Sequence, residues 1–462
     1  MRDITPLVAP CSIAVIGAST DPAKSGGILF KNLLDGVFAG PLYPINPRAE
    51  TVMDIKAYPT IAEVPDAVDL VFIVVPRQYV KEALSQCAAS GAKAACIITA
   101  GFSEIGDGGE EELRKIARDG NILVAGPNTV GMVNAEIGMM GSFVSFPEWK
   151  SGGVSLFAQS GLFAGVYLRQ VMCAESQRLG VGKSIAVGNK LDVDEIDFLA
   201  YAATDPGTEV MGFYLESMRD PRGFLEVAAK VRDKKPIVVL KVGRTSAGAK
   251  ASASHTGSLA TDDALLDAGL NQYGLVRAGD EADFIGLLKA FSMLAPPGGR
   301  RVGVLTTSGA LGVMAVDQLS DAGMEIAEFT PATMERLQSA LPDWQPAGNP
   351  YDFWVALDVM GNRDGHAVPL DAAMADDNTD MVLALLLASP NSDFPKVGQV
   401  FTALRRKHPK KPLVLVIHGS AERDRWLREI EGCGLPVYES SSAAVRVMGA
   451  LAFYAEHTNT DR

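Results

Sequence analysis

The chain has 462 residues, of which 47% are hydrophobic and 21% are charged, a composition typical of globular proteins. At about 150 residues per domain, this length indicates about three domains. The formal net charge of −13 argues against nucleic acid or an anionic membrane as the main partner. Any phosphate site must therefore be built locally, from backbone N–H groups and a few lysine or arginine side chains.

The five cysteines show no metal-ligand spacing, so we expect free thiols and no metal site in this chain. The N-terminus lacks the charged and apolar regions of a signal peptide. No apolar stretch reaches the ~18 residues that a membrane helix requires. These features together predict a cytoplasmic protein without a membrane partner.

Short apolar runs in the first third of the chain predict the strands of one parallel sheet. They lie at residues 12–16, 42–45, 69–75, 94–99 and 122–125. The first run leads through Gly17 into a helical pattern, which is how doubly wound nucleotide-binding folds begin. The glycine fingerprint of a dinucleotide site is missing, and Asn46-Pro47 replaces the acidic residue expected after the second strand.

A glycine, proline or asparagine turn follows each of these five strands. Because open α/β sheets bind ligands at the carboxyl ends of their strands, the turns are candidates for one shared cofactor site. Each turn taken alone is more simply an ordinary tight turn.

The middle third contains two candidate groups for handling a phosphate. Ser160-Gly161 follows a strand pattern and opens a helix, whose N-terminal N–H groups form a ready anion site. Ser160 would serve equally well as the N-cap of that helix. Glu216 follows another strand pattern and, by itself, would be an ordinary solvated strand end. The strands are predicted at residues 153–157, 184–187, 212–215 and 236–240.

A run of small polar residues then follows, from Lys241 to Ala260, and contains one histidine, His255. Such residues bury almost no apolar area, so we predict a loop, suited to wrapping or carrying a phosphate. His255 is a candidate nucleophile, because imidazole is partly neutral near pH 7 and can accept a phosphoryl group. The alternative is a hydrogen-bonded loop histidine without a chemical role.

The last third repeats the pattern of the middle third after a turn-rich linker at residues 295–300. A strand at 301–305 leads into Ser308-Gly309 and a helix, which suggests a duplicated unit with a second helix N-terminus for phosphate. Later strands are predicted at 381–387 and 413–417; His418, at the end of the second, is more simply structural. The predicted domains are 1–138, 139–295 and 300–462.

Several of these segments resemble one known family. Lys241-Val-Gly-Arg-Thr245 and Ser254-His-Thr-Gly-Ser-Leu-Ala260 are similar to the phosphohistidine segment of nucleoside-diphosphate-forming acyl-CoA synthetases. That family includes ADP-forming acetyl-CoA synthetase and, more distantly, succinyl-CoA synthetase. Gly348-Asn-Pro-Tyr-Asp352 also resembles a turn of the family. The resemblance covers nearly the whole chain and implies an α/β fold, with a CoA-binding Rossmann-like domain followed by two flavodoxin-like (succinyl-CoA synthetase-like) domains.

The strand-end turns of the first third resemble the CoA-binding domain of the same family. One departure is Thr129, where the family commonly has cysteine, and we expect CoA binding to tolerate it. The residues that the resemblance implies for coenzyme A are Gly17, Ala18, Ser19, Lys24, Asn46, Pro47, Val75, Pro76, Thr99, Ala100, Gly101, Phe102 and Asn128.

The resemblance also implies the catalytic pair. His255 would take the phosphoryl group, and Glu216 would pair with its imidazole and leave the other ring nitrogen to attack phosphorus. The residues implied for phosphate are Ser160, Gly161, Gly257, Ser258, Ser308 and Gly309.

The implied reaction is acid + CoA + ATP to acyl-CoA + ADP + phosphate, reversible, through an acyl phosphate and phospho-His255, with ADP or GDP as the nucleotide. An ATP-grasp module would add well over ~150 residues, and no region here has room for it. No P-loop is present either. We therefore expect an α-type subunit of a hetero-oligomer or dimer. ATP, ADP and Mg²⁺ would bind to a separate ATP-grasp β-type subunit, and the substrate is an unidentified carboxylic acid.

Two alternatives are a non-catalytic CoA- or acyl-CoA-binding regulatory protein and an enzyme that uses the CoA domain for another acyl transfer. A regulatory protein would have no need for both His255 and Glu216. Aromatic residues near the candidate phosphate turns either contact the acid or pack in the core or a subunit interface. They are Phe157, Phe163, Tyr351, Phe353 and Trp354.

Overall fold

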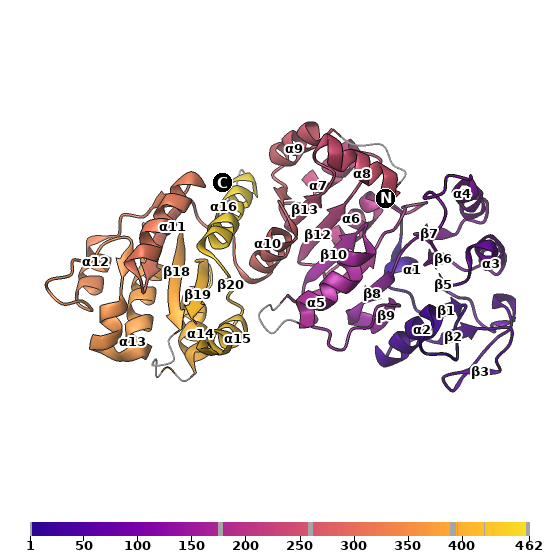
Figure 1. The fold of residues 1–462 in the computed structure, drawn as a ribbon, viewed down its shortest axis with the longest axis horizontal. Coiled ribbons are helices and arrows are strands. Elements are labelled where there is room, and N and C mark those ends of the chain that lie inside the picture. Colours follow the sequence, from indigo (N-terminus) through magenta and orange to yellow (C-terminus); the bar gives the residue numbers. More distant parts are fainter. Residues whose placement is uncertain are drawn as a thin grey trace. The chain divides into compact units, whose positions relative to one another are not determined.

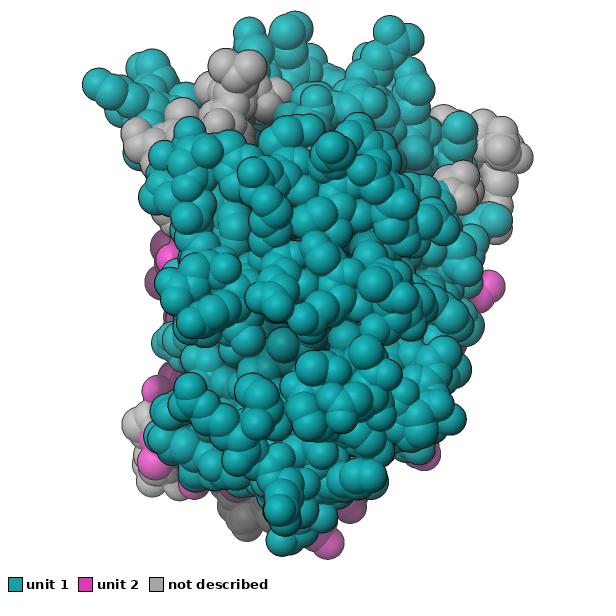
Figure 2. All heavy atoms as spheres, turned by 90° about the vertical axis from the view of Figure 1, so that its right-hand side faces the viewer, with its two compact units in different colours: residues 1–173, 179–277 teal, residues 174–178, 278–462 magenta. Residues whose placement is uncertain are grey.

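The computed structural model describes residues 2–173, 179–256, 262–388, 394, 396–419 and 421–458, which form two compact units. Unit 1 spans Met1–Cys173 and Leu179–Arg277, and unit 2 includes Ala278–Arg462 (Figure 2). Unit 1 contains two large sheets and one two-stranded sheet, and unit 2 contains one large sheet (Figure 1). Within the part of the chain that is described, no helix has both the length and the apolarity needed to cross a bilayer.

The first sheet of unit 1 has five parallel strands in the order β2-β1-β5-β6-β7. The strands are β1 (Ile13–Ile16), β2 (Leu42–Ile45), β5 (Leu70–Ile73), β6 (Ala94–Ile97) and β7 (Leu123–Ala125). The connections contain α2 (Ser25–Asp35), β3 (Thr51–Val52), β4 (Ile55–Lys56), η1 (Ile61–Glu63), α3 (Arg77–Ala89) and α4 (Gly109–Asp119), and α1 (Thr5–Val8) precedes them. Helices cover both faces, so the strands are uniformly apolar, and the five predicted runs are confirmed.

The second sheet has seven strands in the order β14-β13-β12-β10-β11-β8-β9. The strands from β14 to β11 are parallel, and β8 and β9 form an antiparallel hairpin that the sequence did not predict. The strands are β8 (Gly131–Asn134), β9 (Met139–Ser142), β10 (Val154–Ala158), β11 (Val181–Ala186), β12 (Val210–Leu215), β13 (Ile237–Lys241) and β14 (Val276–Arg277). The helices are η2 (Ala135–Ile137), η3 (Leu162–Tyr167), α5 (Leu168–Cys173), α6 (Glu195–Thr204), α7 (Pro221–Ala229), α8 (Ser246–Thr256) and α9 (Asp263–Gln272).

The sheet of unit 2 runs β16-β15-β18-β19-β20, with β17 paired to β15. The strands are β15 (Arg301–Thr306), β16 (Glu325–Ile326), β17 (Tyr351–Asp352), β18 (Met381–Ala388), β19 (Leu413–Gly419) and β20 (Val437–Tyr438). The helices are α10 (Glu281–Met293), α11 (Gly309–Asp321), α12 (Pro331–Gln338), α13 (Trp354–Ala375, kinked at Gly361), α14 (Val397–Lys407), α15 (Ala421–Glu431) and α16 (Ser441–Thr458). Buried Lys289 on α10 pairs with Glu431 at 2.8 Å, which ties α10 to unit 2 although it precedes the predicted linker. The predicted three-domain division remains a prediction.

The three large sheets share one strand order. If their parallel strands are numbered along the chain, with the short strand β17 left out, the order is 2-1-3-4-5, the flavodoxin-like arrangement. The order reverses between strands one and three, and ligands bind at that switch point, beyond the carboxyl ends of the strands. The switch points lie between β1 and β5, between β10 and β12, and between β15 and β18.

Three of the aromatic residues left open by the sequence belong to the core. Phe157 is fully buried and stacks on Phe198 and Phe213, with ring centroids 5.5 and 5.0 Å apart. Tyr351 and Phe353 are also buried, and the Tyr351 hydroxyl donates to Leu337 O at 2.9 Å. These three rings therefore pack in the hydrophobic core.

His366 lies in the core of unit 2 between Phe353, Phe394 and Trp426. Burial lowers its pKa to about 4, although its Nδ1–H donates to Asn362 O at 2.6 Å, which opposes the shift. Its Nε2 has no hydrogen-bond partner among the described residues. The folded protein therefore keeps this imidazole neutral in mildly acidic solution.

Acidification should consequently destabilise unit 2. Between pH 6.5 and about 4, the unfolded chain binds a proton on His366 and the folded chain does not. The free energy of unfolding should fall by up to about 3 kcal/mol across that interval and show no loss from this group above pH 6.5. Denaturant titrations at several pH values should give a clearly smaller fall for His366→Leu. An equal fall in both proteins would contradict this assignment.

Candidate active site

The predicted CoA turns gather at the switch point of the first sheet. Gly17 follows β1 with a φ of +94°, and a Cβ there would lie 2.2 Å from Val74 O, so the position requires glycine. Asn46, after β2, donates from Nδ2 to Ala18 O at 2.9 Å. Asn46 therefore fixes the first turn from the neighbouring strand. The exposed Lys24 is the N-cap residue of α2 at the end of the same turn.

A second group of predicted residues joins the ends of β5, β6 and β7. Thr99 Oγ1 donates to Val75 O at 2.6 Å, and Asn128 N donates to Thr99 O at 3.0 Å. The N–H groups of Gly101 and Phe102 donate to Glu104 Oε2 at 3.2 and 2.6 Å. The structure thus brings these turns together. Because several of the residues bond to one another, they hold the carboxyl edge of the first sheet in shape.

Glu104 and Arg77 are two residues at this edge that the sequence did not single out. Burial would raise the pKa of Glu104, but hydrogen bonds from backbone N–H groups, including that of Phe102, and from Asn189 outweigh it, so the pKa is lowered. The Arg77 guanidinium lies 5.2 Å from the centroid of the Phe102 ring and pairs with Asp107. Arg77 directly follows the Val75-Pro76 turn, and this position in the sequence could have identified it as a candidate.

The switch point of the second sheet holds Ser160-Gly161 and Glu216. Continuing the register of β10 and β12, in which Ala158 lies opposite Tyr214, places Ser160 opposite Glu216. Ser160 Oγ accepts from Leu162 N at 3.2 Å, just before η3, whose N-cap residue is Gly161. Glu216 is partly buried, and its backbone N–H donates to Gln159 Oε1 at 2.9 Å.

Two buried lysines lie at the same edge and were not predicted as site residues. Lys190 Nζ donates to Ser217 O at 2.7 Å and pairs with Glu195 at 3.0 Å. Lys241, at the end of β13, is 3% exposed, and burial lowers its pKa although Asp263 opposes the shift. A lysine that ends an otherwise apolar strand, as Lys241 does, is a signal that sequence reasoning could have used. The charge of Lys190 is compensated by buried Glu195, so Lys241 is the one of these two lysines that adds local positive charge to this edge.

The predicted loop around His255 is wrong in one respect, because Ser246–Thr256 forms helix α8. Alternating alanines favour a helix intrinsically, and Thr245 caps it by accepting at Oγ1 from Gly248 N at 3.0 Å. His255 is on this helix, which follows β13. Strand β13 lies next to β12, and Glu216 is the first residue after β12. Its side chain and the whole of Gly257 and Ser258 lie outside the described residues.

Unit 2 repeats the strand-to-helix turn but has no acidic side chain at the position that corresponds to Glu216. The same register step places Ser308 opposite Leu387, so an apolar residue stands where the second sheet has Glu216. The Gly309 N–H, which opens α11, bonds to the Asp352 carboxylate. Burial raises the pKa of Asp352, and hydrogen bonds from Trp354 and Gly309 partly offset the rise. The Ser308-Gly309 turn therefore has a carboxylate of its own chain at its helix N-terminus.

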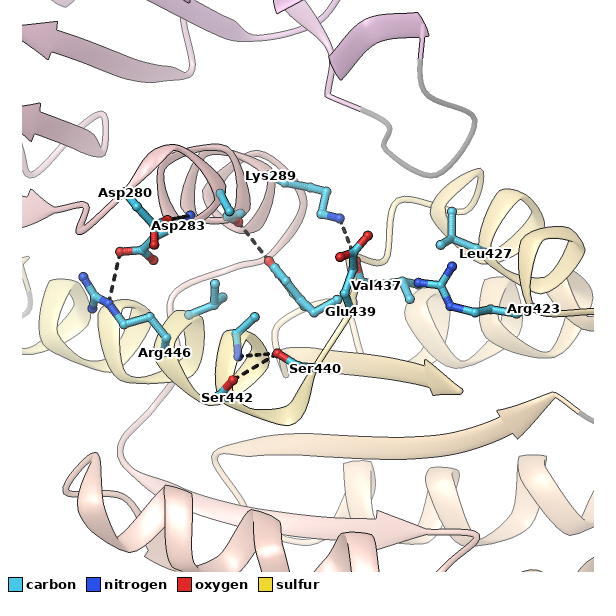
Figure 3. Close-up of a pocket in the computed structure, with 15 residues that line it drawn as sticks. Asp280, Asp283, Lys289, Arg423, Leu427, Val437, Glu439, Ser440, Ser442 and Arg446 are labelled. Atoms are coloured by element: carbon cyan, nitrogen blue, oxygen red, sulfur yellow. Dashed lines mark hydrogen bonds and ion pairs between the residues drawn. The ribbon is translucent and has the colours of Figure 1, made fainter. Parts of the chain in front are cut away.

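A cavity of about 480 Å³ also lies in unit 2, between α10, α15, β20 and the start of α16 (Figure 3). Among its charged groups, Asp283 pairs with Arg446 at 3.3 Å, and Lys289 pairs with Glu431 at 2.8 Å. None of the residues predicted for the site lines this cavity. The turns at the sheet edges, and not this cavity, are therefore the candidate site.

Comparison with known proteins gives the chain its family. Residues 11–135 match a CoA binding domain family, and residues 151–291 match the succinyl-CoA ligase like flavodoxin domain family. The chain is 35% identical over 462 residues to ADP-forming acetate–CoA ligase II of Archaeoglobus fulgidus, covering 98% of this chain and 67% of that protein. It is 33% identical over 455 residues to the α subunit of ADP-forming acetate–CoA ligase II of Pyrococcus furiosus, covering 97% of each.

A solved structure agrees with these matches. The dinucleotide-forming acetyl-coenzyme A synthetase 1 of Ca. Korarchaeum cryptofilum, in complex with phosphate and ADP, superposes with a TM-score of 0.91 at 32% identity, covering 99% of this chain and 98% of that one. The matched domains also confirm the predicted α/β architecture of a CoA-binding domain followed by succinyl-CoA synthetase-like flavodoxin domains. The chain therefore belongs to the nucleoside-diphosphate-forming acyl-CoA synthetases, as an α-type chain, and is an acid–CoA ligase and not a binding protein without catalysis.

Proposed function

We propose that the chain makes acyl-CoA through an acyl phosphate and phospho-His255, with the nucleotide bound by a separate ATP-grasp subunit. In the synthetic direction, ATP on the partner phosphorylates His255. The phosphoryl group then passes to the carboxylate of the acid, and the CoA thiolate attacks the acyl carbonyl and releases phosphate. Every step is reversible, so the same residues serve the formation of ATP from acyl-CoA.

The observation that carries this proposal is the switch point of the second sheet. Continuing the register of β10 and β12 puts Ser160 opposite Glu216 there, and His255 belongs to α8, the helix that follows the adjacent strand β13. A carboxylate that accepts from one ring N–H orients the imidazole and leaves the other nitrogen to attack phosphorus. Backbone N–H groups at Gly161, with Lys241 nearby, would balance the phosphate charge.

CoA would be held at the switch point of the first sheet. The Gly17 turn and Lys24 lie at the start of α2, a position that suits the anionic pyrophosphate. The turns after β6 and β7 are placed to contact the rest of the cofactor, with Asn46 and Thr99 holding the edge in shape. We also infer a cytoplasmic location, because the described cysteines Cys11, Cys87, Cys96 and Cys433 are unpaired.

A partner subunit is supported by the relatives. The Pyrococcus furiosus relative is named as an α subunit and matches this chain end to end, whereas the Archaeoglobus fulgidus relative is longer. The extra part of the longer relative has the room that a nucleotide-binding module requires. We infer that ATP, ADP and Mg²⁺ bind to an ATP-grasp β-type subunit in a hetero-oligomer, and that a carboxylic acid is the third substrate.

A phosphate-labelling experiment tests the proposal. The chain should be incubated with its partner subunit and ATP labelled in the γ-phosphate. It should acquire a label that acid removes and base does not, as a phosphohistidine requires, and adding acid substrate and CoA should convert the label into inorganic phosphate. An acid-stable label, or active synthesis with no labelled chain, would contradict the proposed intermediate.

A further inference from the structure

Gln159 occupies a special place in the second sheet. It is the first residue after β10 and directly precedes the Ser160-Gly161 turn. Its side chain is buried, with 9% exposed, and reaches across the switch point toward the end of β12. A buried amide must satisfy its donors and acceptors within the protein. The hydrogen-bond partners of Gln159 therefore identify the segment that it fixes.

Among the residues that the structure describes, the Gln159 side chain makes three hydrogen bonds, and all of them go to the turn that contains Glu216. Its Oε1 accepts from Glu216 N at 2.9 Å and from Ser217 N at 3.0 Å, and its Nε2 donates to Ser217 Oγ at 3.0 Å. Its backbone N–H donates to Tyr214 O at 2.9 Å. Both acceptor sites of the amide oxygen therefore hold consecutive N–H groups of one turn.

A second side chain fixes the turn from another direction. Lys190 donates to Ser217 O at 2.7 Å and is itself held by buried Glu195. The N–H, hydroxyl and carbonyl of Ser217 are thus all bonded within the chain. Since Glu216 lies between Tyr214-Leu215 and this fixed residue, the network fixes its backbone and the point from which its side chain leaves the turn.

The corresponding position in unit 2 is simpler. Thr307 is the first residue after β15, and its Oγ1 accepts from Leu387 N at 3.0 Å and donates to Leu385 O at 3.5 Å. Leu387 is the counterpart of Glu216 and carries no charge to orient. The bidentate amide therefore occurs in the sheet that has a carboxylate at this position, and a shorter hydroxyl occurs in the sheet that has none.

We propose that Gln159 is a positioning residue for the phosphohistidine step, because it holds the turn that carries Glu216. Because Gln159 also precedes Ser160 directly, it joins the carboxylate turn and the phosphate turn into one rigid group. This inference rests on the proposed function. Misplacement of a catalytic group by about 1 Å can lower a rate by about 100-fold, so the effect of losing the amide should be large.

The test uses the chain with its partner subunit and measures the rate of His255 phosphorylation from ATP. Gln159→Leu keeps the side-chain volume and removes every polar contact, so the rate should fall by about 10- to 100-fold with little change in the KM for CoA. Gln159→Asn keeps the amide but is one methylene shorter. Its phosphorylation rate should also be lower than that of the wild type, which tests the proposal even if the leucine variant does not fold. Asn134→Leu is the matched control, since Asn134 is also a buried amide that bonds backbone groups, Val8 O and Glu136 N, and it should phosphorylate at the wild-type rate.

A double variant separates positioning from general stability. If Gln159 acts through Glu216, adding Gln159→Leu to Glu216→Gln should cause almost no further loss, because the group to be positioned is already gone. Losses that multiply would overturn the inference, as would a wild-type rate in both Gln159 variants. A wild-type rate in Glu216→Gln alone would instead overturn the proposed role of Glu216, so the two failures are distinguishable.

Discussion

Replacing His255 with asparagine should remove nearly all ATP-dependent acyl-CoA synthesis while leaving CoA binding unchanged. Asparagine is polar and of similar size, but its amide nitrogen is not a nucleophile and cannot carry the phosphoryl group. Helix α8 follows strand β13 of the second sheet, whereas the proposed CoA turns belong to the first sheet. Folding and CoA affinity should therefore survive. Thioester formation with the partner subunit measures the loss, and calorimetric titration with CoA measures the binding.

His408→Asn provides the control for that experiment. His408 pairs with Asp371 at 2.8 Å in unit 2, and neither residue belongs to a predicted turn. The same chemical change there should leave synthesis near the wild-type rate. Near-normal thioester formation in His255→Asn would remove His255 from the mechanism, and the phosphoryl carrier would have to be sought elsewhere.

The second large effect is expected for Glu216→Gln. Glutamine keeps one acceptor oxygen but loses the negative charge that favours the cationic imidazole, so orientation and electrostatic support both weaken. General acid–base and orienting effects are worth about 100- to 10,000-fold, and the rate of phosphohistidine formation should fall within that range. Rapid quenching after mixing with labelled ATP and the partner subunit gives this rate directly.

Glu209→Gln is the matched control for Glu216. Glu209 precedes β12, so the two carboxylates flank the same strand at its opposite ends, and Glu209 is exposed. Its replacement should leave phosphorylation unchanged. If Glu216→Gln formed phosphohistidine as fast as this control, Glu216 would be an ordinary strand-end carboxylate without a role in the reaction.

The main strands could be predicted because buried parallel strands are continuous apolar runs that end in turn residues. The runs at β2 and β15 show this clearly, since their predicted and observed positions nearly coincide. The edge strands β14, β16 and β20 have only two residues each, which is too short for a pattern. The hairpin of β8 and β9 escaped prediction because its segment is rich in glycine and methionine and has no regular alternation.

The candidate site divides in a similar way. His255, Glu216 and the strand-end turns could be named as candidates because each follows a strand pattern and the segments resemble those of the family. Helix α8 was missed because its small polar residues suggested a loop, although its alanines and the Thr245 cap favour a helix. Gln159 was missed because its partners, Glu216 and Ser217, lie 57 and 58 residues further along the chain. Hydrogen bonds over such separations leave no local signal.

The connection between the two sheets of unit 1 has a consequence for the thiol-transfer step. The turn after β11 bonds directly to the turn after β7, through Asn189 N to Pro127 O and Leu191 N to Gly126 O, each at 2.9 Å. A bound CoA and an acyl phosphate would therefore be carried by one compact body and react as parts of a single molecule, at an effective molarity far above any cellular concentration. Translational entropy would be lost once, on substrate binding, and not again in the chemical step. Exchange between acyl phosphate and CoA would then be intrinsic to this chain, whereas the nucleotide half of the reaction would vary with the concentration of the partner.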